Sequence, residues 1–145
     1  KAGKPNMFGL IGAEANSIEP EKRMLSSMTP TIIEKDGRLK MVVGSPGGSR
    51  IITSVLQNIL NVIEFDMGMQ ESVSASRFHH QWLPDRIIFE KDFDTLSFSD
   101  LRAKGYHIQR SARNGLGKVD ASLGLDDGRL EGGADPRGDD RASGY

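Results

Sequence analysis

The chain contains no cysteine, and this absence removes several kinds of chemistry. Disulfide bonds, thiolate metal sites and a cysteine nucleophile are all excluded. Long apolar runs are missing as well, since no segment approaches the roughly 20 consecutive residues that a membrane-spanning helix needs. The first residues do not show the charged-then-apolar pattern of a secretory signal segment.

A surplus of charge of one sign is also absent. Lysine and arginine number 19 against 20 acidic residues, which leaves a formal net charge of -1. Phosphate backbones are bound by clustered cations, so this composition argues against a nucleic acid as the partner.

Apolar residues are scarce for a free-standing domain, whereas glycines are many. Apolar residues make up 37% of the chain, and most of the 17 glycines fall in expected loops. The opening run Lys1–Asn6 reads like the interior of a loop. We therefore expect residues 1–145 to form a single domain, or a fragment or processed subunit that relies on other protein for part of its burial.

Two β-hairpins are predicted from their turns. The first covers residues 31–44 and turns at Asp36-Gly37, a pair that tolerates the positive φ of a tight turn. The second covers residues 121–132 and turns at Asp126-Asp127-Gly128. In the first hairpin, β-branched or apolar runs lie on both sides of the turn.

Helices separate the hairpins. The clearest covers residues 49–64, where apolar side chains recur about every 3.6 residues and are expected to face a core, and Ser49 is suited to cap it. We predict an α+β fold in which helices cover one face of a mainly antiparallel sheet. Other expected elements are helices at 70–76 and 97–104, strands at 86–90 and from 106, and a loosely packed tail from Asp135.

The loop Gly44–Ser49 is the best candidate for a site. Without β-carbons, Gly47 and Gly48 let a ligand approach the backbone closely. Their N–H groups and the positive end of the following helix favour a carboxylate, a phosphate or a developing oxyanion. An ordinary strand-to-helix turn explains the same spacing. The loop lacks the lysine of a phosphate loop and the third glycine of a dinucleotide fingerprint, which argues against nucleotide binding.

A second candidate is Ser26-Ser27, which offers two hydroxyl donors to a small anion, although serine pairs are also common in turns.

No nucleophile is evident. Serine or threonine needs an adjacent base or a free amino terminus to react, and Lys1 occupies the terminus. The chain therefore holds binding groups without an activated nucleophile.

The histidines do not predict a metal site. His79 and His80 are neighbours on an extended segment and point to opposite faces, and His107 has no ligand spacing to either. We expect structural or surface roles for this pair, no cofactor, and a packing role for Trp82. Calcium binding is left open for the turn carboxylates at 126, 127, 139 and 140.

Several segments carry a family resemblance. They are Lys22–Thr31, Val43–Ile52 and Arg77–Asp85, with Asp135-Pro136-Arg137 and the final Gly144-Tyr145. These segments resemble the γ-glutamyltransferases (γ-glutamyl transpeptidases), and the third is similar to the bacterial branch. Met24 and Thr29 depart from the pattern, where bacterial relatives usually carry proline and serine.

The resemblance implies an N-terminal-nucleophile hydrolase fold, an αββα sandwich, with this chain as the C-terminal portion of the small subunit. In the family, a precursor cuts itself into a large and a small subunit. The new N-terminal threonine of the small subunit attacks the γ-glutamyl amide. The acyl-enzyme then passes the γ-glutamyl group from a donor such as glutathione to an amino acid, a peptide or water. A periplasmic or secreted location is implied too.

The family's functional residues divide between this chain and the remainder of the protein. Gly47 and Gly48 match the glycines of the oxyanion hole, and Ser26 and Ser27 match the serines that bind the α-carboxylate of the donor. The catalytic threonine lies upstream of the segment that matches Lys1, so we expect the chain alone to be inactive. Expected partners are the large subunit and the missing part of the small subunit, or a second copy of the fragment.

Two other readings remain open. A cephalosporin-type acylase or a polyglutamate-capsule transferase has the same fold, although Ser26-Ser27 favours a glutamyl donor. In the second reading, the chain belongs to a degenerate, non-catalytic relative that serves as a binding or structural module. The residue at the upstream cleavage junction distinguishes an enzyme from such a module.

Overall fold

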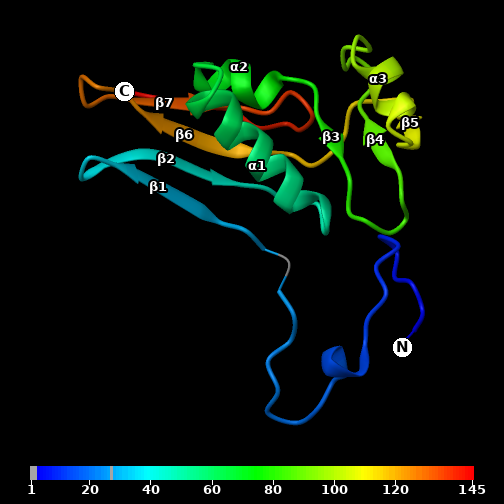
Figure 1. Ribbon diagram of the computed structural model, residues 1–145. Coiled ribbons are helices and arrows are strands. Elements are labelled where there is room, and N and C mark those ends of the chain that lie inside the picture. Colours follow the sequence, from blue (N-terminus) through cyan, green and yellow to red (C-terminus); the bar gives the residue numbers. More distant parts are fainter. Residues whose placement is uncertain (1–2, 27) are drawn as a thin grey trace.

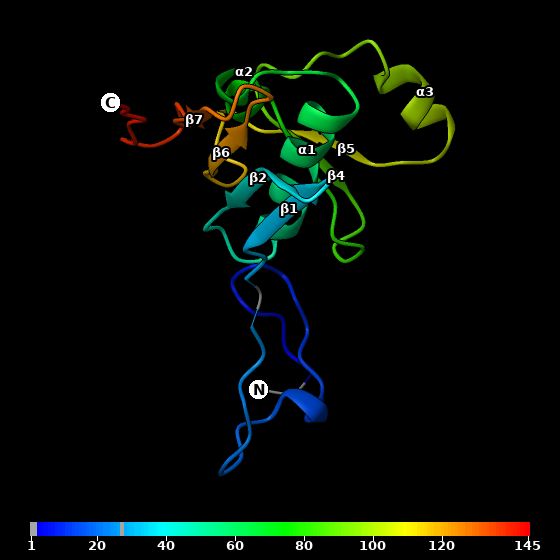
Figure 2. The ribbon, with the colours of Figure 1, turned by 90° about the vertical axis from the view of Figure 1, so that its left-hand side faces the viewer.

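The computed structural model describes residues 3–26 and 28–145. It shows a body of two small sheets and an N-terminal arm, residues 3–26, that extends away from it (Figures 1 and 2). In chain order the elements are η1 (Glu14–Asn16), β1 (Thr31–Lys35), β2 (Arg38–Gly44), α1 (Arg50–Ile63), α2 (Met69–Ser74), β3 (Phe78–His79), β4 (Ile87–Phe89), α3 (Phe98–Ala103), β5 (Ile108–Arg110), β6 (Asp120–Gly124) and β7 (Leu130–Gly133).

The larger sheet has the strand order β1-β2-β6-β7 and is antiparallel throughout. Both predicted hairpins are confirmed. The first turns at Asp36 and Gly37, whose φ angles of 54° and 73° are those that the aspartate–glycine pair favours. Strand β2 pairs with β6, so the two hairpins lie side by side in one sheet.

Helices α1 and α2 cover one face of this sheet (Figure 1). The predicted helix at 49–64 is confirmed as Arg50–Ile63. The capping prediction is wrong, because the Ser49 hydroxyl donates to Gln81 and caps no helix N–H. The main core between helices and sheet consists of Met41, Val43, Ile51, Val55, Val62, Met69, Val73, Val119 and Leu123.

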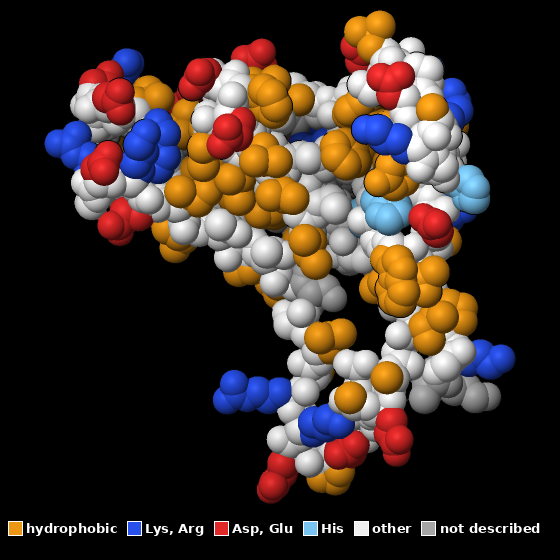
Figure 3. Space-filling model, viewed as in Figure 1, with side chains coloured by type: hydrophobic (Ala, Val, Ile, Leu, Met, Phe, Trp, Pro, Cys, Tyr) orange, Lys and Arg blue, Asp and Glu red, His pale blue; other side chains and the backbone are white. Residues whose placement is uncertain are grey.

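The apolar side chains of α1 form two faces where one was predicted. Ile51 and Val55 are buried in the core, whereas Ile52 and Leu56 are 57% and 51% exposed. The exposed set, here called the α1 apolar face, is visible as a hydrophobic patch over α1 in Figure 3. It consists of Ile52, Leu56, Leu60, Ile63 and, just past the helix, Phe65.

The smaller sheet has the order β3-β4-β5 and is mixed. Strands β4 and β5 are parallel, and α3 makes the crossover between them that a parallel pair requires. Phe89 and Phe98 pack at its centre with ring centroids 4.5 Å apart. The prediction of a mainly antiparallel sheet is confirmed, and β4–β5 is the parallel exception among the described strands. Hydrophobic periodicity could not reveal that exception, because it predicts strands and not their partners.

The N-terminal arm is mostly exposed, including Ile18 and Met24. It contacts the body near its start, where the Phe8 ring lies against Gly48 and Gly9 lies against Pro84. The arm therefore reaches the candidate loop through one aromatic side chain. Among the described residues, no helix combines the length and the apolarity needed to cross a bilayer.

Candidate active site at the junction of β2 and α1

The glycine loop, residues 44–49, joins the end of β2 to the start of α1. Gly47 and Gly48 have φ angles of 140° and 60°, which side-chain-bearing residues rarely adopt. A β-carbon on Gly48 would lie 2.3 Å from Phe8 Cζ. Within the described part of the chain, neither glycine N–H donates to a backbone acceptor. Two donors therefore remain for an anion beside the N-terminus of α1.

The other wall of the loop is formed by residues 115–117. A β-carbon on Gly47 would lie 3.4 Å from the Cα atom of Gly117. Helix α1 holds this wall, because the Ser54 hydroxyl donates to the Leu116 carbonyl over 2.9 Å. The glycine loop is thus packed between the Phe8 ring and a second backbone segment.

A chain of polar side chains links α1 to the extended segment after α2. The Ser49 hydroxyl donates to Gln81 Oε1 over 2.6 Å, and His79 Nε2 lies 2.8 Å from the same oxygen. Thr53 Oγ1 lies 2.7 Å from His79 Nδ1. Burial lowers the pKa of His79, which favours its neutral form. His79 therefore has the structural surroundings that were predicted for it.

A small cleft opens beside this polar chain, between the arm and the start of α1. Its volume is about 170 Å³, and its lining includes Phe8, Ser49, Arg50 and Arg86. Two arginines among its lining residues, Arg50 and Arg86, favour an anionic group in this cleft.

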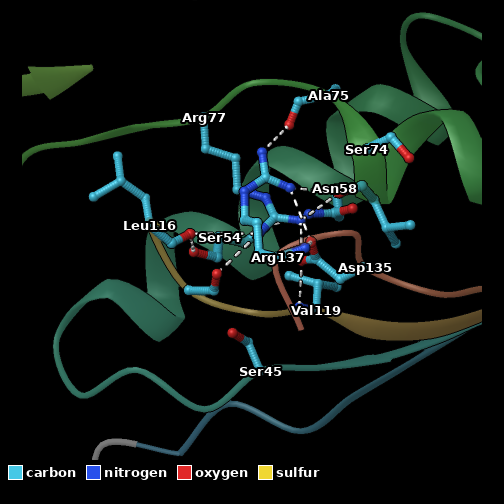
Figure 4. Close-up of polar contacts among 12 residues, drawn as sticks. Ser45, Ser54, Asn58, Ser74, Ala75, Arg77, Leu116, Val119, Asp135 and Arg137 are labelled. Atoms are coloured by element: carbon cyan, nitrogen blue, oxygen red, sulfur yellow. Dashed lines mark hydrogen bonds and ion pairs between the residues drawn. The ribbon is translucent and has the colours of Figure 1, made fainter. Parts of the chain in front are cut away.

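A buried ion cluster lies on the other side of the 115–117 wall. It consists of Arg77, Glu90, Asp135 and Arg137, three of which are labelled in Figure 4. Arg77 Nη2 lies 2.7 Å from Asp135 Oδ2, and Arg137 Nη1 lies 3.0 Å from Asp135 Oδ1. Arg137 also donates to Glu90 through Nε over 2.8 Å. Each arginine has a carboxylate partner, so the cluster is neutral overall.

Backbone N–H groups also donate hydrogen bonds to the two buried carboxylates, those of Glu90 and Asp135. Glu90 Oε1 accepts from the N–H groups of Gly115 and Leu116, both over 2.8 Å. Burial would raise the pKa of Glu90, but these bonds and the one from Arg137 outweigh it and lower that pKa. The pKa of Asp135 is lowered for the same reason. Burial would raise it, but hydrogen bonds from the N–H groups of Arg137 and Val119, together with the positive charge of Arg77, outweigh burial.

The ion cluster corrects the prediction of a loosely packed tail. Asp135 is 1% exposed, and the Arg137 side chain is 5% exposed. Sequence reasoning missed this cluster because Arg77, Glu90 and the Asp135–Arg137 pair lie far apart along the chain. A charged Glu90 at the end of an apolar strand was the available signal, since a buried charge needs a partner.

The other predicted site residues are less well supported by geometry. Ser26 is exposed on the arm and accepts a weak bond from the Met28 N–H over 3.4 Å, and Ser27 lies outside the described residues. No hydrogen bond joins Ser26 to the glycine loop within residues 3–26 and 28–145. Trp82 is 75% exposed, so it has little packing within this chain. No group of acidic or histidine side chains among the described residues is arranged to hold a metal ion.

Known proteins resemble the chain along its whole length. Residues 1–145 match the family model described as gamma-glutamyltranspeptidase. The glutathione hydrolase proenzyme of Escherichia coli K12 is 47% identical over 100% of this chain, and the chain covers 25% of that protein. The proenzyme of Pseudomonas aeruginosa is 43% identical over 95% of this chain, which again covers 25% of it. The chain thus spans about a quarter of the length of these relatives.

Solved structures agree with these matches. A Helicobacter pylori gamma-glutamyltranspeptidase variant superimposes with a TM-score of 0.86 at 48% identity, covering 95% of this chain and 75% of that chain. Bacillus anthracis CapD, at 24% identity and a TM-score of 0.74, shares the fold over 99% of this chain and 84% of its own.

These likenesses define the fold as that of the N-terminal-nucleophile hydrolases. With its whole length matched and relatives above 40% identity, the chain belongs to the gamma-glutamyltranspeptidase family.

Proposed function

We propose that the complete protein is a γ-glutamyl acyltransferase and hydrolase that acts on glutathione and other γ-glutamyl amides. The observation that carries the proposal is the pair of positive-φ glycines, Gly47 and Gly48, at the start of α1 in a chain whose relatives are glutathione hydrolases. In this proposal Gly47 and Gly48 form the oxyanion hole, and Ser26 and Ser27 bind the α-carboxylate of the donor.

The proposed reaction is acyl transfer through a threonine ester. The threonine hydroxyl, from the part of the protein upstream of this chain, attacks the γ-carbonyl carbon and gives up its proton. The carbonyl oxygen becomes an oxyanion, which the N–H groups of Gly47 and Gly48 stabilise by about 3 kcal/mol each. The C–N bond then breaks, the amine leaves with a proton, and an amino acid, a peptide or water takes the acyl group.

The proposal assigns a partner to the α1 apolar face. The chain covers only 25% of the Escherichia coli relative, so three-quarters of a protein of that length lies outside it. A continuous exposed apolar stripe on a helix is typical of a covered surface. We propose that the rest of the same protein, the large subunit and the upstream part of the small subunit, packs on this face. A periplasmic or secreted location follows from the family resemblance.

The test compares the complete protein with the 145-residue chain. We expect the complete protein to release the amine from a chromogenic γ-glutamyl amide and to be inhibited by acivicin, the inhibitor of a relative with 48% identity. The chain alone should release none, because the threonine lies elsewhere. Turnover by the purified chain would contradict this assignment.

An acylase or a capsule transferase is the second candidate, because a cephalosporin acylase from Bacillus halodurans matches 77% of the chain with a TM-score of 0.67. Glutathione and acivicin distinguish the two. If neither binds the complete protein and a cephalosporin side-chain amide is hydrolysed, the γ-glutamyl assignment fails. A degenerate, non-catalytic relative would lack turnover of all these amides.

A further inference from the structure

The side-chain amide of Gln81 uses its full hydrogen-bonding capacity. Its Nε2 donates to the carbonyls of Phe8 and Leu83 over 2.7 Å and 2.9 Å. Its Oε1 accepts from Ser49 Oγ over 2.6 Å and faces His79 Nε2 at 2.8 Å. A glutamine amide has two donor hydrogens and two acceptor lone pairs, so no capacity is left over.

These partners fix both the amide orientation and the histidine tautomer. Carbonyl oxygens only accept, so Nε2 must face Phe8 and Leu83, and Oε1 must face Ser49 and His79. His79 therefore carries its proton on Nε2. Its Nδ1 then faces the Thr53 hydroxyl, 2.7 Å away on the next turn of α1, whose oxygen also lies 3.1 Å from the Arg50 carbonyl.

The contacts of Gln81 fall on both sides of Gly48. Ser49 is the residue that follows Gly48, and the carbonyl that Gln81 holds belongs to Phe8, whose ring covers Gly48. The Gln81 side chain, just past the end of β3, therefore bonds both to the glycine loop, through Ser49, and to Phe8, the aromatic residue packed on that loop.

We propose that Gln81 is a positioning residue, which holds the Gly47 and Gly48 N–H groups in the orientation that acyl transfer requires. The inference rests on the proposed function for what these groups do. A displacement of about 1 Å in a catalytic group can lower the rate on the order of 100-fold. Because an oxyanion develops only in the transition state, loosened donors lower kcat and leave KM nearly unchanged.

Gln57 provides a matched control on the same helix. Its Nε2 donates to the carbonyls of Thr53 and Phe78 over 2.7 Å and 2.8 Å, and its Oε1 accepts from the Phe78 N–H over 3.0 Å. The two bonds with Phe78 join α1 to β3, the bond with Thr53 lies within α1, and none involves the glycine loop or Phe8. Loss of the Gln57 amide therefore costs a similar number of hydrogen bonds away from the donors.

The experiment uses the complete protein with Gln81→Met, Gln57→Met or Ser49→Ala. Two quantities are measured: kcat and KM for a chromogenic γ-glutamyl amide, and hydrogen exchange of residues 44–50 by mass spectrometry. We expect Gln81→Met to lower kcat about 10- to 100-fold with KM within about threefold, and to speed exchange of residues 44–50. Gln57→Met should leave kcat and that exchange unchanged. Ser49→Ala, which removes one bond, should have a smaller effect in the direction of Gln81→Met.

A fourth variant separates the contacts of Gln81 Oε1, with Ser49 and His79, from the contact of its Nε2 with Phe8. Gln81→Glu keeps oxygens for Ser49 and His79 but has no hydrogen for the Phe8 carbonyl. Exchange should therefore speed up at residues 6–10 while residues 44–50 stay protected. Equal changes of kcat and exchange in Gln81→Met and Gln57→Met would overturn the inference. If the parent protein turns over no γ-glutamyl amide, the proposed function fails, and the exchange of residues 44–50 alone decides the positioning role.

Discussion

A single methyl group at Gly48 meets two separate obstacles. The φ angle of 60° costs about 1–2 kcal/mol for a residue with a β-carbon. The same β-carbon would lie 2.3 Å from Phe8 Cζ, so the aromatic ring must also move. Both effects disturb the N–H group that we assign to the oxyanion hole.

We therefore predict that Gly48→Ala in the complete protein destabilises folding and lowers kcat for a γ-glutamyl amide. Gly37→Ala is the matched control, because Gly37 has a φ angle of 73° and no neighbouring atom within 4 Å of an added β-carbon. Urea unfolding should show a loss of about 1–2 kcal/mol for Gly37→Ala and a larger loss for Gly48→Ala. Partial recovery of stability by a second change, Phe8→Ala, would identify the ring as the cause. Equal losses for the two glycines would contradict the contact with Phe8.

At the scale of elements, the ion cluster connects the end of α2, the end of β4 and the C-terminal segment. Arg137 donates to the carbonyls of Val73 and Ala75, at the end of α2, over 2.9 Å and 2.8 Å. It also holds Glu90, which binds the backbone of residues 115 and 116 behind the glycine loop. The C-terminal segment thereby braces the loop that carries the proposed oxyanion donors.

Arg137→Met should destabilise the complete protein by about 3–5 kcal/mol, because it leaves the Glu90 carboxylate buried without its partner. Arg129 is the control, since its ion pair with Asp127 is exposed, at 77% and 51% of the two side chains. Arg129→Met should change stability by about 0–1 kcal/mol. Chemical denaturation measures the free energy of unfolding of both variants. Similar losses would show that the buried ion pair contributes no more stability than the exposed one.

The ion cluster also sets the response to acid. The pKa values of Glu90 and Asp135 are lowered from ordinary values of 4.5 and 3.8. The unfolded chain therefore binds protons at a higher pH than the folded chain does. The stabilisation is complete above about pH 4.5 and is lost as the pH falls through the lowered pKa values.

Unfolding midpoints of the complete protein, measured from pH 7 down to pH 2, should decline slightly below about pH 6.5, because the pKa of His79 is lowered in the fold, and more steeply below about pH 4.5. Glu90→Gln removes one of the two titrating groups. The variant should be less stable at pH 7 and should lose less additional stability in acid than the parent. An unchanged acid slope in Glu90→Gln would assign the acid sensitivity to other carboxylates.

At the scale of the whole molecule, local signals predicted the elements well. The aspartate–glycine turn at 36–37 and the apolar repeat of α1 depend only on neighbouring residues, and both predictions are confirmed. The parallel pairing of β4 with β5 and the contact of Arg77 with Asp135 depend on distant segments, which no local pattern encodes. For the site, spacing left the glycine loop open between an anion site and an ordinary turn, and the family resemblance assigned Gly47 and Gly48 to an oxyanion hole. The contacts of Gln81 with Ser49 and Phe8 join segments far apart in the chain, so no local pattern predicts them.

The α1 apolar face carries the prediction that concerns assembly. Leu56 lies at its centre and is 51% exposed in the chain taken alone. If the rest of the protein covers this face, a charge at Leu56 must be buried without a partner, which is costly. We therefore predict that Leu56→Glu in the complete protein weakens association of the two subunits and lowers the thermal midpoint. Leu96→Glu is the control, because Leu96 is 83% exposed and lies outside this face.

The 145-residue chain should respond in the opposite direction. There the face has no cover, so the parent chain is expected to self-associate through it, and Leu56→Glu should shift the chain toward the monomer in analytical ultracentrifugation. Leu96→Glu should change neither the subunit association nor the sedimentation of the chain. A subunit interface that tolerates Leu56→Glu as well as Leu96→Glu would place the rest of the protein on another surface.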